Sequence, residues 1–364
     1  MAFRDHGWVT GRNIGLPSLL LCVAGLLALA LPAHAAFPGM NGKIAFSTSR
    51  DSQPGQFVSR IYTMDPDGTN QLLLTAGEGI ASGGQWSPDG MRLVFNCAFE
   101  QQEFVICTIN ADGTGLTRLT AGGNPTWAPD GKKITFQRAS DIFVMNADGS
   151  GQTNLTNDLA FPRDFGPVWS PDGNKIAFTS SRSNDVGFPI YLMNPDGTGI
   201  TRVTSPRPGR ADVASDWSPD GSRIAFASSR DGPQDVYSIN ADGTGLARLT
   251  MSLDGYFSES PAWSPDGQQI AFGSDRGDPD PNDEFPLSSV YAMNSDGSNV
   301  VRLTNIPGAF EGSPTWQPIP APQRGDYKNA AHFCKAERDF VGDAAFRQRY
   351  GGGANAHGIC VSGK

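Results

Sequence analysis

Trp263-Ser264-Pro265-Asp266-Gly267, followed two residues later by Ile270-Ala271-Phe272, is one copy of a segment that recurs along this chain. The same Trp-Ser-Pro-Asp-Gly segment begins at Trp86, Trp169 and Trp217, and a variant with Ala in place of Ser begins at Trp127. Successive copies lie 41, 42, 48 and 46 residues apart. Self-similarity at such a fixed period is the sequence signature of a repeat architecture.

Each copy carries strand and turn signals in the same order. An apolar run of the Ile-Ala-Phe type follows the Trp segment, and a second run such as Ile190-Tyr191-Leu192-Met193 then ends in an Asn-x-Asp-Gly turn. A short third run, for example Arg248-Leu249-Thr250, closes the unit. Pro presets φ in such turns, Asp bonds to the local backbone and Gly accepts positive φ. Together with the Trp strand, these runs predict four strands per unit, the composition of a β-propeller blade.

The number of units follows from the turns and from the two ends of the repeat region. The Asp-Gly turns fall at Gly68, Gly113, Gly149, Gly197, Gly243 and Gly297. The first unit, opened by Ile44-Ala45-Phe46, has no Trp strand before it, whereas Pro314-Thr315-Trp316 has no unit after it. We therefore predict an all-β, six-bladed propeller over residues 36–318, in which the segment around Trp316 supplies the inner strand of the first blade. Pairing the two ends in one sheet removes the exposed edges that an open array of blades would carry.

Residues 1–35 have the features of a cleaved signal peptide. Arg4 and Arg12 precede an uncharged apolar run from Leu16 to Leu31, and Ala33-His34-Ala35 follows as a cleavage motif. This run is shorter than the ~20 residues of a membrane-spanning helix, although a retained N-terminal anchor is the alternative. We predict an exported protein, extracellular, cell-wall associated or periplasmic, with no membrane span after cleavage. The net charge of −9 disfavours nucleic acid as a partner.

The repeated Trp-Ser-Pro-Asp-Gly-x-x-Ile-Ala-Phe, Tyr-x-Met-Asn-x-Asp-Gly-Thr and Arg-Leu-Thr motifs resemble the TolB-like, WD40-like (PD40) β-propeller repeat family. The resemblance covers roughly Phe37 to Pro318 and implies a propeller fold. TolB members of this family also carry an N-terminal α/β domain. Because the first unit starts close behind the predicted cleavage site, we expect that domain to be missing, and nothing that depends on it is carried over.

Four cysteines remain after the predicted cleavage, and they form two local pairs without Cys-x-x-Cys spacing. In an exported chain this pattern favours disulfides over a zinc site. Cys97 and Cys107 fall on the second and third strands of one unit. In the next unit, a two-residue turn at Ser140-Asp141 would set Arg138 opposite Phe143. The same register predicts that Cys97 lies directly opposite Cys107 and is bonded to it.

The C-terminal part differs in composition from the repeats. Residues 319–325 form a Pro-rich linker, and residues 326–364 form a small separate segment with a helical stripe that runs from Tyr327 to Ala345. Cys334 and Cys360 are expected to staple this segment, because a region of this size buries little core. Cell-wall association, docking on the acidic ring and a simple stapled cap are the open alternatives for its role.

Strand alternation places the short Pro-Asp-Gly and Asn-x-Asp-Gly turns on one face of the ring and the long loops on the other, which we call the irregular face. Binding residues concentrate on variable loops that a rigid scaffold holds, so the irregular face is the predicted binding face. The candidate partner-binding residues mix charge with aromatic surface, as interfaces do. They are Arg163, Asp164, Arg207, Arg210, Asp212, Tyr256, Glu259, Phe310 and Glu311. The recurring arginines Arg50, Arg182, Arg230 and Arg276 are expected instead to be structural and to pair with neighbouring carboxylates.

The sequence contains no recognisable catalytic or metal-binding constellation. The four histidines, His6, His34, His332 and His357, all lie outside the repeat units, and the Asp-Gly turns lack the further ligands of a calcium loop. We therefore predict no cofactor, no metal and no catalysis. The expected function is that of a monomeric binding or scaffold propeller that engages a protein, a small ligand or a glycan. The alternative is a carbohydrate- or peptide-active enzyme that uses carboxylates at the channel mouth.

Overall fold

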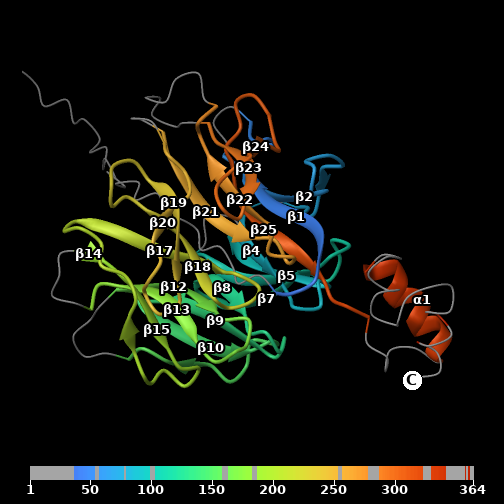
Figure 1. Ribbon diagram of the computed structural model, residues 1–364, viewed down its shortest axis with the longest axis horizontal. Coiled ribbons are helices and arrows are strands. Elements are labelled where there is room, and N and C mark those ends of the chain that lie inside the picture. Colours follow the sequence, from blue (N-terminus) through green and yellow to red (C-terminus); the bar gives the residue numbers. More distant parts are fainter. Residues whose placement is uncertain are drawn as a thin grey trace, which may run out of the picture.

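The computed structural model describes residues 37–53, 57–77, 79–98, 103–157, 163–182, 187–252, 256–277, 287–322 and 329–341, together with His357 and Cys360. Six sheets surround a common centre, each built from four antiparallel strands, and one of them carries a fifth strand (Figure 1). The predicted six-bladed propeller is therefore confirmed. The predicted signal peptide, residues 323–325 of the predicted linker, and Tyr327 and Ala345 of the predicted helical stripe lie outside the described residues.

The first three blades follow one another along the chain. Blade 1 consists of β25 (Glu311–Ile319), β1 (Met40–Thr48), β2 (Arg60–Met64) and β3 (Leu72–Leu73). Blade 2 consists of β4 (Ile80–Trp86), β5 (Arg92–Ala98), β6 (Val105–Asn110) and β7 (Thr117–Ala121). Blade 3 consists of β8 (Gly123–Trp127), β9 (Lys133–Arg138), β10 (Asp141–Asn146) and β11 (Thr153–Asn154).

The last three blades repeat this order, with one addition. Blade 4 consists of β12 (Asp164–Trp169), β13 (Ile176–Ser180), β15 (Ile190–Met193) and β16 (Thr201–Arg202). Blade 5 consists of β17 (Arg210–Trp217), β18 (Arg223–Ser228), β19 (Asp235–Asn240) and β20 (Ala247–Arg248). Blade 6 consists of β21 (Ser258–Trp263), β22 (Gln269–Ser274), β23 (Ser289–Asn294) and β24 (Val301–Arg302). The addition is β14 (Gly187–Phe188), which leaves blade 4 and pairs in parallel with the inner strand of blade 5.

The ring closes as the sequence predicts. Strand β25 pairs with β1 in antiparallel register, with Trp316 opposite Ile44 and Thr315 opposite Ala45. The closing strand also reaches blade 2, because Gln317 Nε2 donates a 2.7 Å hydrogen bond to the carbonyl oxygen of Gly90. The two ends of the repeat region therefore share one sheet, and the second of them also contacts the next blade.

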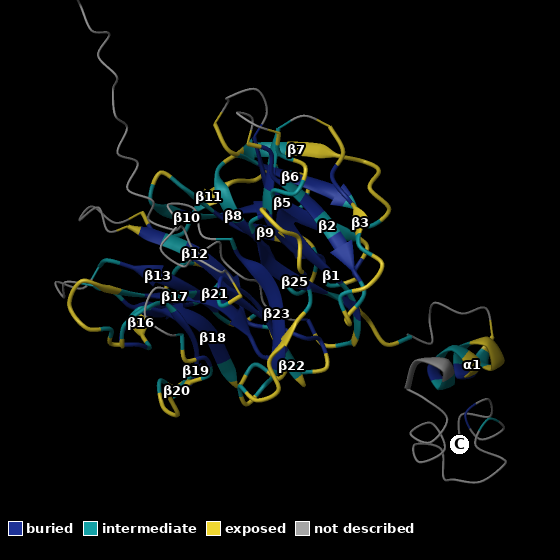
Figure 2. Cartoon of the chain, turned by 90° about the horizontal axis from the view of Figure 1, so that it is seen from above, coloured by how far each residue is buried: buried dark blue, intermediate teal, exposed yellow. Residues whose placement is uncertain are grey.

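The hydrophobic core is divided into wedges between neighbouring blades. One wedge joins Trp217 and Phe226 of blade 5 to Val168 and Ile190 of blade 4, and all four side chains are buried. The tryptophan that ends the inner strand and the phenylalanine of the next strand recur in this role around the ring. Most of the strands near the centre of the ring are dark blue in Figure 2, whereas the outer strand β7 is yellow. Burial of the repeated Trp and Phe explains why these two residue types mark the repeat, since truncating such a side chain costs about 3–5 kcal/mol.

Polar contacts fix neighbouring blades to each other. The backbone N–H of Trp263 donates to Asp216 Oδ2 at 2.5 Å, and Thr179 Oγ1 donates to the carbonyl oxygen of Asp212 at 3.1 Å. The Asn-x-Asp-Gly turns also approach the neighbouring blade. A Cβ on Gly297, whose φ is +88°, would lie 2.7 Å from the carbonyl oxygen of Leu249. Glycine is therefore required there both for its positive φ and for this approach.

A single helix among the described residues, α1 (Ala330–Val341), lies outside the ring (Figures 1 and 2). The predicted helical segment is confirmed over this range, and Cys334 of α1 is bonded to Cys360 as predicted. Across the described part of the chain, no helix has both the length and the apolar character needed to cross a membrane.

Candidate functional site

Three of the predicted partner-binding carboxylates, Asp164, Asp212 and Glu311, are completely buried at the starts of inner strands. Each forms an ion pair with one of the recurring arginines. Arg182 Nη2 lies 2.6 Å from Asp164 Oδ2, Arg230 Nη2 lies 2.5 Å from Asp212 Oδ2, and Arg50 pairs with Glu311. The predicted structural role of these arginines is confirmed. The three carboxylates are not accessible to a partner, so we leave them out of the candidate surface.

Each of these arginines makes the same additional contacts, and we call the whole arrangement the arginine clamp. Arg230 Nε also donates to Ser228 Oγ at 3.2 Å, and its guanidinium carbon lies 5.2 Å and 5.3 Å from the ring centroids of Phe226 and Tyr237. Arg50 and Arg182 repeat this arrangement with their own hydroxyl and aromatic pair. Because the hydroxyl, the carboxylate and both rings hold it, the arginine charge stays fixed where the second and third strands of the blade meet the irregular face.

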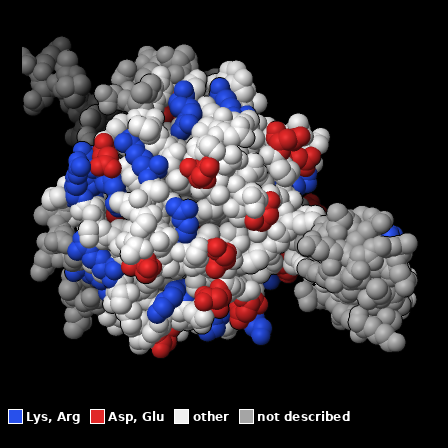
Figure 3. Space-filling model, in the orientation of Figure 1, with Lys and Arg blue, Asp and Glu red and all other residues white. Residues whose placement is uncertain are grey.

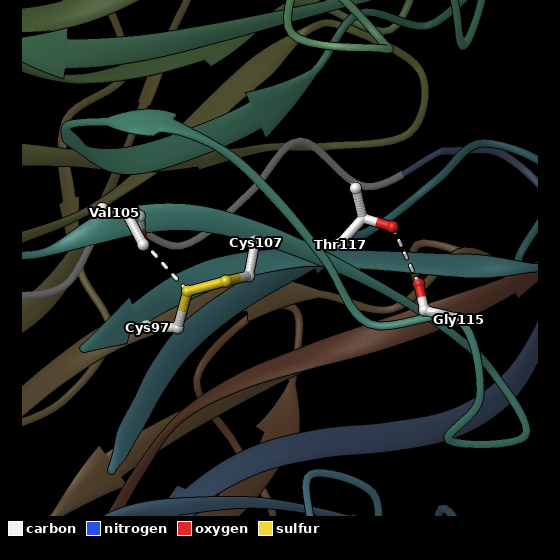
Figure 4. Close-up of a disulfide and its surroundings, with 5 residues drawn as sticks. All are labelled: Cys97, Val105, Cys107, Gly115 and Thr117. Carbon is white, nitrogen blue, oxygen red and sulfur yellow. Dashed lines mark hydrogen bonds between the residues drawn. A yellow bond between two sulfur atoms is a disulfide. The ribbon is translucent and has the colours of Figure 1, made fainter. Parts of the chain in front are cut away.

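In blade 2 a disulfide takes the place of the clamp. Cys97 occupies the position of the clamp hydroxyl, two residues after Phe95, and Cys107 occupies the tyrosine position opposite Phe95. The two cysteines are bonded, with 6.0 Å between their Cα atoms (Figure 4). The predicted bond is confirmed, but the predicted register is wrong.

The correction to the register is a shift along the hairpin. Cys97 lies opposite Val105, so the disulfide joins a diagonal pair, and its Cys97 Sγ atom lies 3.4 Å from the Val105 carbonyl oxygen. In blade 3, Arg138 correspondingly lies opposite Asp141 and not opposite Phe143. The two turn residues are therefore Ala139 and Ser140, both with positive φ (+50° and +72°), as a tight hairpin turn with the strand twist requires.

Blade 6 departs from the clamp in another way. Ser258 stands at the carboxylate position, and Arg276 Nη2 donates to its hydroxyl at 3.0 Å. The next residue, Glu259, is only 6 % exposed, and within the described part of the chain its Oε2 atom accepts no hydrogen bond. Burial, together with the nearby charge of Asp275, raises the pKa of Glu259 to about 7. Of the predicted carboxylates, this is the one that no arginine holds.

The predicted residues that remain exposed gather on blades 4 and 5. Strand β14 sets Gly187 beside Arg210 and Phe188 beside Ala211. The Phe188 ring lies 5.9 Å from that of Phe165, and the N–H of Arg210 donates to the carbonyl oxygen of Arg207 at 3.0 Å. Arg163 lies two residues before Phe165 and is exposed. We call these residues the arginine–phenylalanine patch: Arg163, Phe165, Phe188, Arg207 and Arg210.

The electrostatics of the patch contrast with those of the whole chain. In Figure 3 most of the visible Lys and Arg side chains lie in the left half of the view, on the side where Figure 1 places β14 and β17. Within the patch, Arg207 has an ion pair with Asp231 at 3.2 Å, and the Arg207 side chain is 73 % exposed. Solvent screens such a pair, so its arginine remains able to exchange partners.

Two further predicted residues lie elsewhere on the irregular face. Tyr256 precedes β21 of blade 6 and Phe310 precedes β25 of blade 1, and both are partly buried. The N–H of Phe310 donates to Ser49 Oγ at 2.8 Å, which ties this residue to the end of β1. The structure thus brings Arg207 and Arg210 together, places Arg163 before β12 of the neighbouring blade 4, and leaves Tyr256 and Phe310 on other blades.

Sequence reasoning missed both phenylalanines of the patch. Phe188 is an aromatic residue between Gly187 and Pro189 in a loop, and Phe165 directly follows a predicted site residue. An apolar aromatic in an otherwise polar loop is the signal that could have identified Phe188. Its pairing with β17 is not visible in the sequence, because that contact joins two different blades.

Among the described residues, no group of three or more His, Cys, Asp or Glu side chains is arranged to hold a metal ion. The geometry that these residues do show is a clamped, rigid ring with an arginine–phenylalanine patch on its irregular face. Such an arrangement can bind a complementary surface without any covalent chemistry.

Comparison with known proteins defines the family. The TolB beta propeller domain family (PD40) matches residues 35–212 and 207–321, and the chain belongs to this family. The Tol-Pal system protein TolB of Anaeromyxobacter dehalogenans strain 2CP-C is 35 % identical over 128 residues, which cover 30 % of this chain and 29 % of that protein. The uncharacterized protein Atu1656 of Agrobacterium fabrum is 34 % identical over 91 residues, covering 24 % of this chain and 31 % of that protein. The chain therefore spans under a third of the length of these curated relatives.

Solved structures show the same fold. TolB from Acinetobacter baumannii superposes with a TM-score of 0.62 at 22 % identity, covering 76 % of this chain and 67 % of that one. A putative TolB from Agrobacterium tumefaciens gives a TM-score of 0.57 at 21 % identity, covering 76 % and 99 %. At these identities the likeness establishes the propeller alone.

Proposed function

We propose that this chain is an exported, non-catalytic binding propeller that uses the arginine–phenylalanine patch to bind a partner protein in the cell envelope or outside the cell. The observation that carries the proposal is the patch itself. Strand β14 holds Phe188 beside the inner strand of blade 5, where its ring contacts that of Phe165 from blade 4. Three exposed arginines, Arg163, Arg207 and Arg210, flank these segments in the sequence. Aromatic and Arg side chains are the residue types enriched in the cores of protein interfaces.

The charge of the patch indicates the kind of partner. In a chain of net charge −9, a cluster of arginines is a local exception. Guanidinium groups form bidentate bonds with carboxylates, so an acidic surface with an apolar centre would complement the patch. Such a partner would be steered by charge, and its association rate would fall as the salt concentration rises.

Three further observations support the export and the absence of catalysis. The described residues contain two disulfides, as is typical of proteins in oxidising compartments. Three buried carboxylates are held by arginines and are not free for acid–base work. Relatives with the same repeats are named as Tol-Pal system proteins, and membership in an envelope assembly of that kind would suit a chain with a predicted signal peptide.

The proposal is tested by affinity capture from the parent cell envelope with three baits. These are the mature protein, a patch variant (Arg163→Ala, Phe188→Ala and Arg210→Ala) and a control variant (Lys132→Ala and Lys133→Ala). The control removes two exposed cations from a turn on the opposite face. A protein captured by the first and third baits but lost from the second is the expected result. Equal capture by all three would move the binding surface away from the patch.

A further inference from the structure

A cavity of about 380 Å³ opens on the irregular face between blades 2 and 3, on a different part of the ring from the arginine–phenylalanine patch. Its walls come from both blades. Ser82, Asn96 and Phe104 belong to blade 2, Gly123 and Arg138 belong to blade 3, and Gly122 joins the two. The volume lies within the range of about 300–1,000 Å³ that small-molecule sites occupy.

The cavity lies where blade 3 lacks the carboxylate and the arginine positions of the clamp. Gly122 stands five residues before Trp127, where Asp164 and Asp212 stand before their own tryptophans. Ser140, in the tight turn after β9, stands at the place of the clamp arginine. A Cβ on Gly122 would lie 2.8 Å from the Gln137 carbonyl oxygen, so no side chain can refill the space.

The short connection between the two blades keeps the cavity open. A single residue, Gly122, separates β7 from β8, whereas the other described connections between blades are six residues or longer. The long loops that cover the irregular face elsewhere are therefore not present at this point.

The blade 2 wall presents hydrogen-bond donors. Ser82 and Asn96 lie directly opposite each other on β4 and β5, and opposed residues of an antiparallel pair point to the same side of the sheet. Asn96 Oδ1 accepts the backbone N–H of Asn124 at 2.8 Å, which fixes the orientation of the amide and leaves Nδ2 as a donor. Asn96 is only 5 % exposed, yet among the described residues no acceptor is bonded to its Nδ2.

The blade 3 wall contributes a cation. The guanidinium carbon of Arg138 lies 4.1 Å from the centroid of the Phe143 ring, and Arg138 Nη1 donates to Gln152 at 2.7 Å. Stacking on the ring restricts the guanidinium, while the N–H groups that do not face Gln152 have no hydrogen-bond partner within the described part of the chain. A guanidinium held in this way is preorganised to bind an anion.

We propose that this cavity binds a carboxylate group. Ser82, Asn96 and Arg138 offer an excess of donors and one positive charge, which matches a group with two acceptor oxygens and one negative charge. Glu103 lies on the exposed rim of the cavity, and its negative charge would repel the second negative charge of a phosphate dianion. A carboxylate, which carries a single negative charge, is therefore favoured over phosphate. Phe104, which is 50 % exposed beside it, provides an apolar surface for the rest of the ligand.

The test is isothermal titration calorimetry of the mature protein with carboxylates and their matched amides. N-acetylphenylalanine and N-acetylphenylalaninamide differ only in this group, and a tripeptide with a free or an amidated C-terminus extends the comparison to peptides. Glucuronate against glucose tests a sugar as the source of the carboxylate. Inorganic phosphate serves as the dianion. We expect each carboxylate that fits to bind at least 10-fold more tightly than its neutral counterpart.

Three variants locate the binding. Arg138→Gln removes the cation, and Asn96→Asp keeps the acceptor for Asn124 while replacing the donor with a negative oxygen. Each should weaken carboxylate binding at least 10-fold. Ser82→Ala provides a milder variant should Asn96→Asp not fold. Arg118→Gln changes an exposed arginine on β7, outside the cavity, and should leave binding unchanged.

The outcome that contradicts the proposal is equal binding of acid and amide, no binding of either, or equal loss in Arg118→Gln. The patch variant defined above should bind carboxylates normally, which separates this site from the proposed protein surface.

Discussion

Arg230 and Asp212 form an ion pair in the interior of the protein. The Arg230 side chain is only 10 % exposed, and the Asp212 side chain is not exposed at all. Removing both charges from water is expensive, so their mutual attraction mainly offsets the desolvation of the pair. The clamp therefore contributes more to fixing the position of the strands than to the free energy of folding. Breaking it from one side leaves an uncompensated charge in the interior.

We expect Arg230→Met to lower the free energy of unfolding by about 3–5 kcal/mol, because Asp212 stays buried without its cation. The double variant with Asp212→Asn should recover part of this loss, since it removes the orphaned charge. Urea unfolding followed by tryptophan fluorescence measures both. Arg207→Met, which breaks an exposed pair, is the matched control and should change stability by no more than about 0.5 kcal/mol. Equal losses in the two single variants would mean that burial of the clamp does not cause the loss in the free energy of unfolding.

Glu259 predicts a pH dependence of stability. Its folded pKa of about 7 lies above the ordinary value of 4.5, so its protonated form is favoured in the native state. The contribution of this residue is fully present below pH 4.5 and is lost as the pH rises through about 7. The loss amounts to at most about 3 kcal/mol at pH 8.

The variant Glu259→Gln should remove this loss. Unfolding measured at pH 5 and pH 8 should show a smaller decrease in stability for the variant than for the wild type, and the variant should be the more stable of the two at pH 8. Glu103→Gln changes an exposed carboxylate and should keep the wild-type difference. A wild-type difference that persists in Glu259→Gln would show that this carboxyl is not its source.

At the scale of the elements, the disulfide of blade 2 and the clamps of blades 1, 4 and 5 hold the same two strands at the same place. Cys97 and Cys107 join the second and third strands where Ser228 and Tyr237 do so through Arg230. We expect Cys97→Ser with Cys107→Ser to cost about 2–3 kcal/mol, the usual effect of opening a short disulfide loop. Cys97→Ser with Cys107→Tyr should recover part of the loss, because Tyr fills the space opposite Phe95. Thermal melts under non-reducing conditions test this. The pair Cys334→Ser and Cys360→Ser is the control, and it should leave the main transition unchanged.

The sequence could predict those elements that a local sequence pattern specifies. The strands, the six blades and the closure through Trp316 all follow from a repeated local pattern, and both disulfide pairs follow from proximity along the chain. The predicted register of the blade 3 hairpin was wrong because the observed turn residues, Ala139 and Ser140, adopt positive φ, which their residue types do not favour. Strand β14 was missed because the strand that it pairs with belongs to another blade. The clamp carboxylates were placed on the surface because the predicted strand order alone does not show that Asp212, on β17, and Arg230, just after the neighbouring strand β18, are buried together.

At the scale of the whole molecule, the ring combines rigid inner strands with loops that differ from blade to blade. The clamps and the inter-blade bonds fix the positions of all six inner strands, and the loops of the irregular face can then differ from blade to blade at little cost. Blades 4 and 5 use this freedom to build an apolar, cationic surface, and blades 2 and 3 use it to leave a cavity. Both features depend on the closed ring, because each lies across the contact between two blades.

Closure is therefore the property on which the rest of the molecule depends, and β25 provides it. Removing residues 311–364 would take the inner strand from blade 1 and expose Ile44 and Phe46, which are otherwise buried. It would also remove the bond from Gln317 to Gly90, so two blade contacts are lost together. We expect this truncation to abolish the cooperative thermal transition and to make the chain sensitive to limited proteolysis. Truncation after Pro322, which keeps β25 and removes α1, is the matched control and should retain the transition within a few degrees. If the longer truncation also melts cooperatively, the five remaining blades form a stable open array and the closing strand is dispensable.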